Sequence, residues 1–103
     1  MNLDNYKSIY FIGIGGIGMS ALAHYFVNQG AKVSGYDRSK TELTKDLEKI
    51  GVEISYDENI NSLKDLENIQ LTIFTPAINP KNIYFEYFKK SQVPLLKRSQ
   101  ILG

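Results

Sequence analysis

The sequence of 103 residues contains no cysteine and only one histidine, His24. Without cysteine the chain has no disulfide bond, no thiolate metal site and no cysteine nucleophile. A single histidine excludes an HExxH zinc motif and leaves no plausible Ser/His/Asp set, and no GxxxxGK[ST] loop is present. We therefore expect a binding site without catalytic residues and without a metal.

Long apolar runs and an excess of one charge are also missing. The formal net charge is +1, with no long basic run, so nothing favours nucleic acid or an anionic membrane as a partner. No apolar stretch approaches the roughly 20 residues of a membrane-spanning helix, and no charged and then apolar leader opens the chain. These absences predict a cytoplasmic location, and the length suits one domain with a modest core.

The most informative stretch runs from Ile9 to Leu22. Apolar residues 9–12 lead into a segment with glycine at positions 13, 15, 16 and 18. Behind it, apolar residues recur at the spacing of one helix face, at Met19, Leu22, Ala23, Phe26 and Val27. The pattern predicts a strand, a glycine turn and a helix, and its glycines fit the phosphate-binding GxGxxG fingerprint in the context that gives it weight.

In that fingerprint each glycine has a physical reason. The first, Gly13, permits a tight turn, the second, Gly15, lets backbone N–H groups approach a diphosphate, and the third, Gly18, packs the helix against the strand. The helix N-terminus adds unpaired N–H donors and a partial positive charge. We predict a nucleotide or phosphate site here.

Strand and helix patterns alternate along the rest of the chain. We expect strands at 8–14, 31–36, 52–56, 69–74 and 93–96, and a first helix at 18–29. A Ser39-x-x-Glu42 capping box predicts the start of the second helix, and Asn79-Pro80 predicts an N-cap and N1 for another that ends at Lys89-Lys90. The polar segment 57–68 suits a short or irregular helix, and Ser99 suits the cap of a further one.

This alternation predicts an α/β fold, a Rossmann-like doubly wound parallel sheet of five strands in the order 3-2-1-4-5 with helices on both faces. We expect residues 1–103 to form a single domain. In such a sheet, ligands bind beyond the carboxyl ends of the strands, where the order reverses between the first and fourth strands.

Two polar residues follow the second strand. Asp37 comes about 20 residues after Gly18, the spacing of an acidic residue that binds a ribose. It could bind the hydroxyls of a sugar or an N–H of a base, or merely cap its own loop. Arg38 could face a 2′-phosphate, although a solvated side chain is the simpler interpretation.

The ends of the fourth and fifth strands supply the other candidates. Thr75 offers a hydroxyl and turn N–H groups near the diphosphate, or belongs to a plain proline turn, and Lys97 and Arg98 add positive charge or are simply solvated. The candidate substrate-binding residues are Gly13, Gly15, Gly16, Ile17, Gly18, Met19, Ser20, Asp37, Arg38, Ser39, Thr75, Pro76, Ala77 and Ile78.

These residues alone leave several functions open. A domain that binds a UDP-sugar, an NAD(P)-binding domain of an oxidoreductase and a regulatory nucleotide-binding module all suit a glycine turn followed by Asp37.

A resemblance favours the first. The stretch from Phe11 to Ser20, FIGIGGIGMS, closely resembles the N-terminal motif of the Mur ligase family, in the form typical of UDP-N-acetylmuramate–L-alanine ligases of peptidoglycan synthesis. The similarity continues through VSGYD at 33–37, Ala77-Ile78 with Asn79 downstream, and PLLKR at 94–98. The chain departs from the family pattern at Ile17, Tyr36 and Thr75-Pro76, which affects the expected uracil pocket more than the diphosphate cradle.

The resemblance implies a three-domain enzyme, of which this chain is the N-terminal domain that binds the UDP part of UDP-N-acetylmuramate. A central ATPase domain with a P-loop and a C-terminal domain are expected to be absent from this sequence. In the family, ATP phosphorylates the lactyl carboxylate, L-alanine attacks the acyl phosphate, and Mg²⁺ assists. We therefore expect no cofactor in this chain, and ATP and Mg²⁺ in the full-length enzyme.

Overall fold

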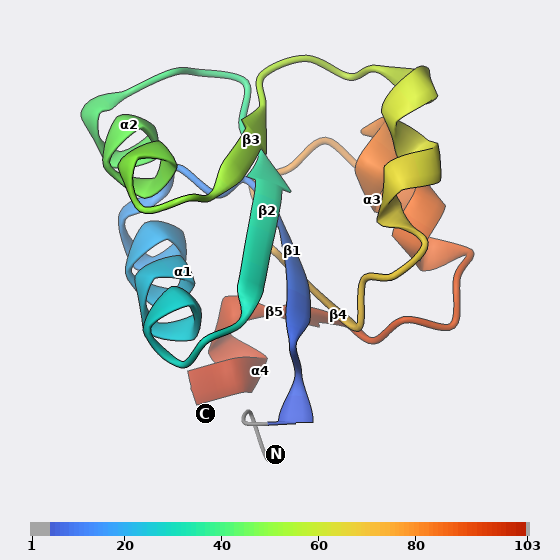
Figure 1. Cartoon of the computed structure of the whole chain (residues 1–103). Coiled ribbons are helices and arrows are strands. Elements are labelled where there is room, and N and C mark those ends of the chain that lie inside the picture. The colour runs from blue at the N-terminus through green and yellow to red at the C-terminus, as the bar shows by residue number, and fades with distance from the viewer. Residues whose placement is uncertain (1–4, 103) are drawn as a thin grey trace.

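A computed structural model describes residues 5–102 and contains one parallel sheet. Its strands are β1 Ser8–Ile12, β2 Lys32–Tyr36, β3 Glu53–Ser55, β4 Leu71–Phe74 and β5 Leu95–Lys97. They pair in the order β3-β2-β1-β4-β5, and every pair is parallel (Figure 1). The predicted fold class and strand order are confirmed.

Helices cover both faces of the sheet. They are α1 Ile17–Asn28, α2 Glu42–Lys49, α3 Ile83–Lys89 and α4 Arg98–Leu102, with a 3₁₀ helix, η2, at Ile60–Leu66 in the segment predicted to be short or irregular. Figure 1 shows α1 and α2 on one side of the sheet and α3 on the other. Among residues 5–102, no helix is long and apolar enough to span a membrane.

The residues of β1 explain why this strand is central. Ile9 and Phe11 pack into one apolar cluster with α1 and α2, while Tyr10 and Ile12 pack into a second cluster with α3. All four are at most 3% exposed, as expected for a strand covered on both faces. The carboxyl end of β1 therefore lies in the middle of the sheet edge, between the ends of β2 and β4.

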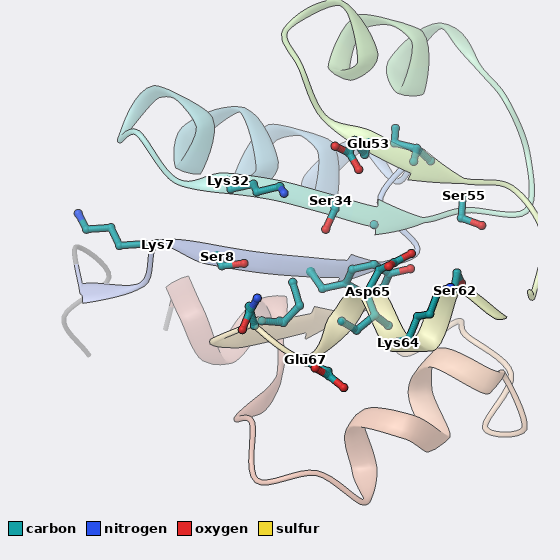
Figure 2. Close-up of a pocket in the computed structure, with 16 residues that line it drawn as sticks. Lys7, Ser8, Lys32, Ser34, Glu53, Ser55, Ser62, Lys64, Asp65 and Glu67 are labelled. Carbon is teal, nitrogen blue, oxygen red and sulfur yellow. The ribbon is translucent and has the colours of Figure 1, made fainter. Parts of the chain in front are cut away.

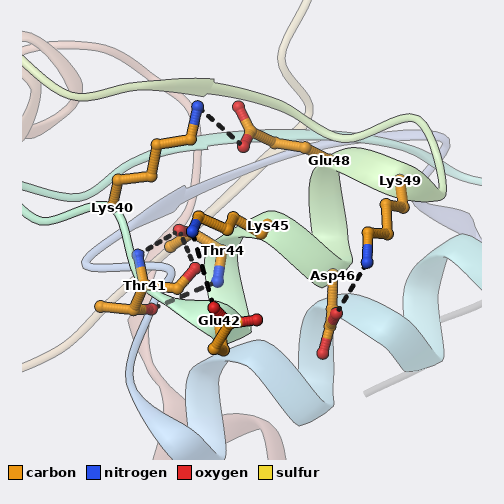
Figure 3. Close-up of polar contacts among 8 residues, drawn as sticks. All are labelled: Lys40, Thr41, Glu42, Thr44, Lys45, Asp46, Glu48 and Lys49. Atoms are coloured by element: carbon orange, nitrogen blue, oxygen red, sulfur yellow. Dashed lines mark hydrogen bonds and ion pairs between the residues drawn. The ribbon is translucent and has the colours of Figure 1, made fainter.

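The predicted start of α2 is wrong by two residues. The N-cap is Thr41, not Ser39: Thr44 N–H donates to Thr41 Oγ1 at 3.3 Å, and Thr41 N–H donates to Thr44 Oγ1 at 2.8 Å (Figure 3). The N–H of Ser39 instead donates to Asp37 Oδ1, so the chain is still turning at that point.

Ion pairs near the surface of the same segment join Lys40 to Glu48, Lys45 to Glu42 and Lys49 to Asp46 (Figure 3).

The predicted start of α3 is wrong for a similar reason. Asn79 Oδ1 accepts the N–H of Lys81 at 2.8 Å and forms a local turn. The N-cap is Asn82, which is buried and accepts the N–H groups of Tyr84 and Phe85 at 2.9 and 3.2 Å. Two asparagines three residues apart both suit a cap; the buried one caps the helix, and the exposed one forms a turn. Likewise, α4 begins at Arg98, so Ser99 is not its cap.

Candidate functional site

Residues 13–18, here called the glycine segment, leave β1 and enter α1 at the centre of the sheet edge. The chain turns at Gly13, whose φ of +88° is strained for any residue with a Cβ. A Cβ at this position would also collide with the side chain of Thr75. The N–H groups of Gly13 and Ile14 both donate to the carbonyl of Tyr36, at 2.7 and 3.0 Å. The end of β2 thus fixes the start of the segment, and β1 ends at Ile12 instead of residue 14.

Gly15 packs directly against Asp37. Its N–H donates to Asp37 Oδ2 at 2.8 Å, and a Cβ on Gly15 would lie 2.8 Å from that oxygen and 3.0 Å from Thr44 Cγ2. The other carboxylate oxygen, Oδ1, accepts the N–H of Ser39 at 3.0 Å. Both oxygens of Asp37 therefore already have backbone donors, and the N–H of Gly15 points to Asp37 and not to the cleft.

Gly16 is in a different situation. It is the exposed N-cap of α1 with extended backbone angles (φ −65°, ψ 153°) that any residue can adopt. A Cβ there would meet its nearest neighbour, Met19 Cγ, at an ordinary 3.6 Å. No side chain caps α1, and no acidic residue lies in its first turn. Among the described residues, the N–H groups of Ile17, Gly18 and Met19 have no acceptor and are available to an anion.

An open cleft of about 410 Å³ lies beside Gly16. It is formed by the ends of β1, β4 and β5, and none of the described residues that line it is acidic. The lining residues are Gly16, Ile17, Gly18, Met19, Thr75, Pro76, Lys97, Arg98 and Ser99. A Cβ on Gly18 would lie 2.6 Å from Arg98 Nε, so the guanidinium lies against the first turn of α1. Within residues 5–102, no carboxylate is within ion-pair distance of Arg98. Two cations and a helix N-terminus thus make the cleft suitable for an anionic group.

The binding residues predicted from the sequence occupy different places in the structure. Those that line the cleft are Gly16, Ile17, Gly18, Met19, Thr75 and Pro76. Those that shape its support are Gly13, Gly15, Asp37 and Ser39. Arg38, Ala77 and Ile78 lie at the same strand ends without lining the cleft, and Ser20 is buried, with its Oγ donating to the carbonyl of Ile17 at 3.1 Å.

The candidate residues omitted from that prediction are Lys97, Arg98 and Ser99. The sequence pattern places Lys97 and Arg98 at the same crevice as possible sources of charge, although they are not among the predicted binding residues, and it indicates Ser99 only as a helix cap. The available signal was their position at the end of the fifth strand, since the carboxyl ends of all parallel strands meet at one edge.

A larger groove of about 970 Å³ runs along the sheet face between β2, β3 and η2. Figure 2 shows that polar side chains from these elements project into it, with lysines and carboxylates interspersed. The groove includes Lys32 and Lys64 but also Glu53 and Asp65, and no residue of the glycine segment lines it. Its mixed charge and its position give it no anion-binding character.

In the part of the chain described, no group of three or more His, Cys, Asp or Glu residues could hold a metal ion.

Comparison with known proteins identifies the family. The family described as "Mur ligase family, catalytic domain" matches residues 8–103. This chain belongs to the Mur ligase family. The resemblance predicted from the glycine segment is therefore confirmed.

Individual Mur ligases agree with this assignment. A UDP-N-acetylmuramate–L-alanine ligase of Flavobacterium johnsoniae is 45% identical over the whole chain, which spans 23% of that relative's length. The crystal structure of UDP-N-acetylmuramate–alanine ligase from Thermotoga maritima matches with a TM-score of 0.82 at 33% identity, over 92% of this chain and 21% of that one. The crystal structure of a UDP-N-acetylmuramate:L-alanyl-gamma-D-glutamyl-meso-diaminopimelate ligase from Neisseria meningitidis, at 23% identity and a TM-score of 0.81 over 94% of this chain and 30% of that one, shows the shared fold.

Proposed function

We propose that this chain binds the UDP part of UDP-N-acetylmuramate for an ATP-dependent ligase that adds L-alanine during peptidoglycan synthesis. Support comes from the similar UDP-N-acetylmuramate–L-alanine ligases and from the geometry of the glycine segment. The observation that carries the proposal is Gly16. The protein itself gives no steric reason for glycine at this position, whereas a diphosphate lying on the free N–H groups of α1 would need the space of its Cβ.

In this proposal, different parts of the ligand contact different walls of the cleft. The diphosphate accepts from the N–H groups of Ile17, Gly18 and Met19, and Arg98, which lies against the same turn of α1, adds positive charge. The nucleoside extends toward residues 37–39, at the end of β2, as expected for a ligand at the switch point of a doubly wound sheet. Thr75 and Pro76 close the side formed by β4.

The chemical step is expected elsewhere. This chain spans only 23% of the Flavobacterium relative, and it contains neither a P-loop nor, in residues 5–102, a cluster of metal ligands. We propose that ATP and Mg²⁺ bind to central and C-terminal domains that lie outside this sequence, and that the ligase is cytoplasmic. The 103 residues would then supply recognition of the nucleotide half of the substrate, as one domain.

A ligand titration tests this function. We expect UDP and UDP-N-acetylmuramate to bind weakly and with similar affinity, because the partners of the sugar and lactyl group lie largely in the missing domains. Backbone amide shifts should change at 13–20, 37–39 and 75–78, and neither ATP hydrolysis nor alanine ligation should be detectable. Tighter binding of NAD or NADP than of UDP would instead favour an oxidoreductase domain, and shifts confined to the groove of Figure 2 would exclude the proposed site.

A further inference from the structure

The carboxylate of Asp37 connects two loops that are far apart in the sequence. Oδ2 accepts the N–H of Gly15, in the glycine segment, at 2.8 Å, and Oδ1 accepts the N–H of Ser39, in the loop before α2, at 3.0 Å. Each bond has a charged acceptor and is therefore among the stronger hydrogen bonds of a protein. One side chain thus joins the loop after β1 to the loop after β2.

The packing around Gly15 shows that this contact is built into the fold. A Cβ on Gly15 would approach both Asp37 Oδ2 and Thr44 Cγ2 to 3.0 Å or less, so only glycine lets the backbone lie this close. Thr44 is fully buried, and the capping box that it forms with Thr41 fixes the first turn of α2. The glycine segment therefore rests on a rigid support of which Asp37 is the polar part.

We propose that Asp37 is a positioning residue that holds the glycine segment in its diphosphate-binding conformation, and that it does not read the nucleoside. The proposal rests on the proposed function, because it assigns a role within that same site. It differs from the expectation drawn from the sequence, in which the spacing from Gly18 gave Asp37 to the ribose or the base. Asp37 would act on the ligand through Gly15, by fixing the direction of the neighbouring N–H groups that face the cleft.

Three roles of Asp37 predict different outcomes for the Asp37→Asn variant: a purely electrostatic role, a positioning role and a role in reading the nucleoside. If Asp37 acted only through its charge, removing a negative charge near an anion site would strengthen diphosphate binding. If Asp37 positions the segment, binding of inorganic diphosphate and of UDP should weaken by the same factor, roughly tenfold, while uridine binding changes little. A role in reading the nucleoside predicts the reverse pattern, with uridine and UDP weakened and diphosphate unchanged.

Asp37→Glu separates charge from geometry. It keeps the negative charge but moves the carboxylate by one methylene, so it should also lose the Gly15 bond and weaken diphosphate binding. Asp46→Asn is the matched control, since it removes the same charge from the exposed pair with Lys49 on α2. We expect no loss of diphosphate affinity in this control.

Hydrogen exchange tests the contact without any ligand. In Asp37→Asn the Gly15 amide should exchange about tenfold faster or more, since its acceptor loses the charge, with shift changes across residues 13–16. Unchanged exchange at Gly15, or a loss of affinity for uridine without a loss for diphosphate, would overturn the proposal. If the unsubstituted chain bound neither UDP nor diphosphate, the proposed function would fail, and exchange at Gly15 would still decide whether Asp37 holds the segment.

Discussion

The two halves of the glycine segment contain the same residue type for different reasons. In the inner half, Gly13 has a positive φ and contacts Thr75, and Gly15 lies against Asp37. In the outer half, Gly16 has ordinary backbone angles, and an added Cβ would make only ordinary contacts with the protein. Gly13 and Gly15 are therefore required by the fold of this chain, whereas we propose a bound ligand as the reason for glycine at position 16. Substitutions in the two halves should separate stability from binding.

Gly13→Ala should have the largest effect, and it should be on stability. The substitution combines a strained φ of +88° with a collision against Thr75, so we expect the free energy of unfolding to fall by about 2–4 kcal/mol. Urea denaturation measures this change. Gly30→Ala is the matched control, because Gly30 has the same φ but nothing within 4 Å of an added Cβ, and it should cost only about 1 kcal/mol. Equal losses in the two variants would show that Thr75 yields without cost.

Gly16→Val should show the opposite behaviour. Its Cβ meets no protein atom closely, so stability should fall by no more than about 1 kcal/mol, the cost of a poorer N-cap. Binding of UDP should weaken by more than about tenfold, because the side chain occupies the space of the diphosphate. Calorimetric titration and circular dichroism measure the two quantities, and Ala21→Val, on an exposed position of α1, is the control. A folded Gly16→Val chain with unchanged UDP affinity would contradict the proposed site.

Thr41→Ala tests the support behind the inner half. It removes the side-chain acceptor at the N-cap of α2 and should destabilise the chain by about 1 kcal/mol in thermal or urea unfolding. Ser39→Ala should have almost no effect on stability, because only the backbone N–H of Ser39 is engaged. If the two variants had reversed effects, the cap would lie where the sequence pattern first indicated.

Arg98→Ala should have the smallest effect; Arg98 lines the cleft next to the outer half of the glycine segment. Arg98 is exposed, so loss of its contact with a phosphate should weaken UDP binding by only about threefold to fivefold, and less at high salt. Lys89→Ala, at the exposed C-terminal end of α3, removes the same charge away from the cleft and should leave binding unchanged. Similar titration curves for the two variants would remove Arg98 from the site.

The sequence was sufficient for the sheet and its strand order, because the alternation of strands and helices and the apolar residues of β1 determine both. It was not sufficient for the choice between nearby polar residues. Ser39 and Thr41 both suit the cap of α2, and the difference is made by Asp37, which takes the N–H of Ser39. The direction of the Asp37 carboxylate could not be predicted from the sequence either, since an acidic residue at that spacing can face the ligand or the backbone of Gly15. The direction of that carboxylate depends on a contact with Gly15, 22 residues away in the sequence, and the cap of α2 in turn depends on the same carboxylate.

The glycine motif cannot adopt its conformation alone, because its N–H groups donate to the carbonyl of Tyr36 and the carboxylate of Asp37. Residues 9–22 contain the whole sequence motif. However, the N–H groups of residues 13, 14 and 15 donate to Tyr36 and Asp37, at the end of β2. A peptide that ended before β2 would have the full signature and no cradle. The glycine segment can hold this conformation only with β2 in place beside β1, so a fragment that keeps these three hydrogen bonds extends at least through Asp37.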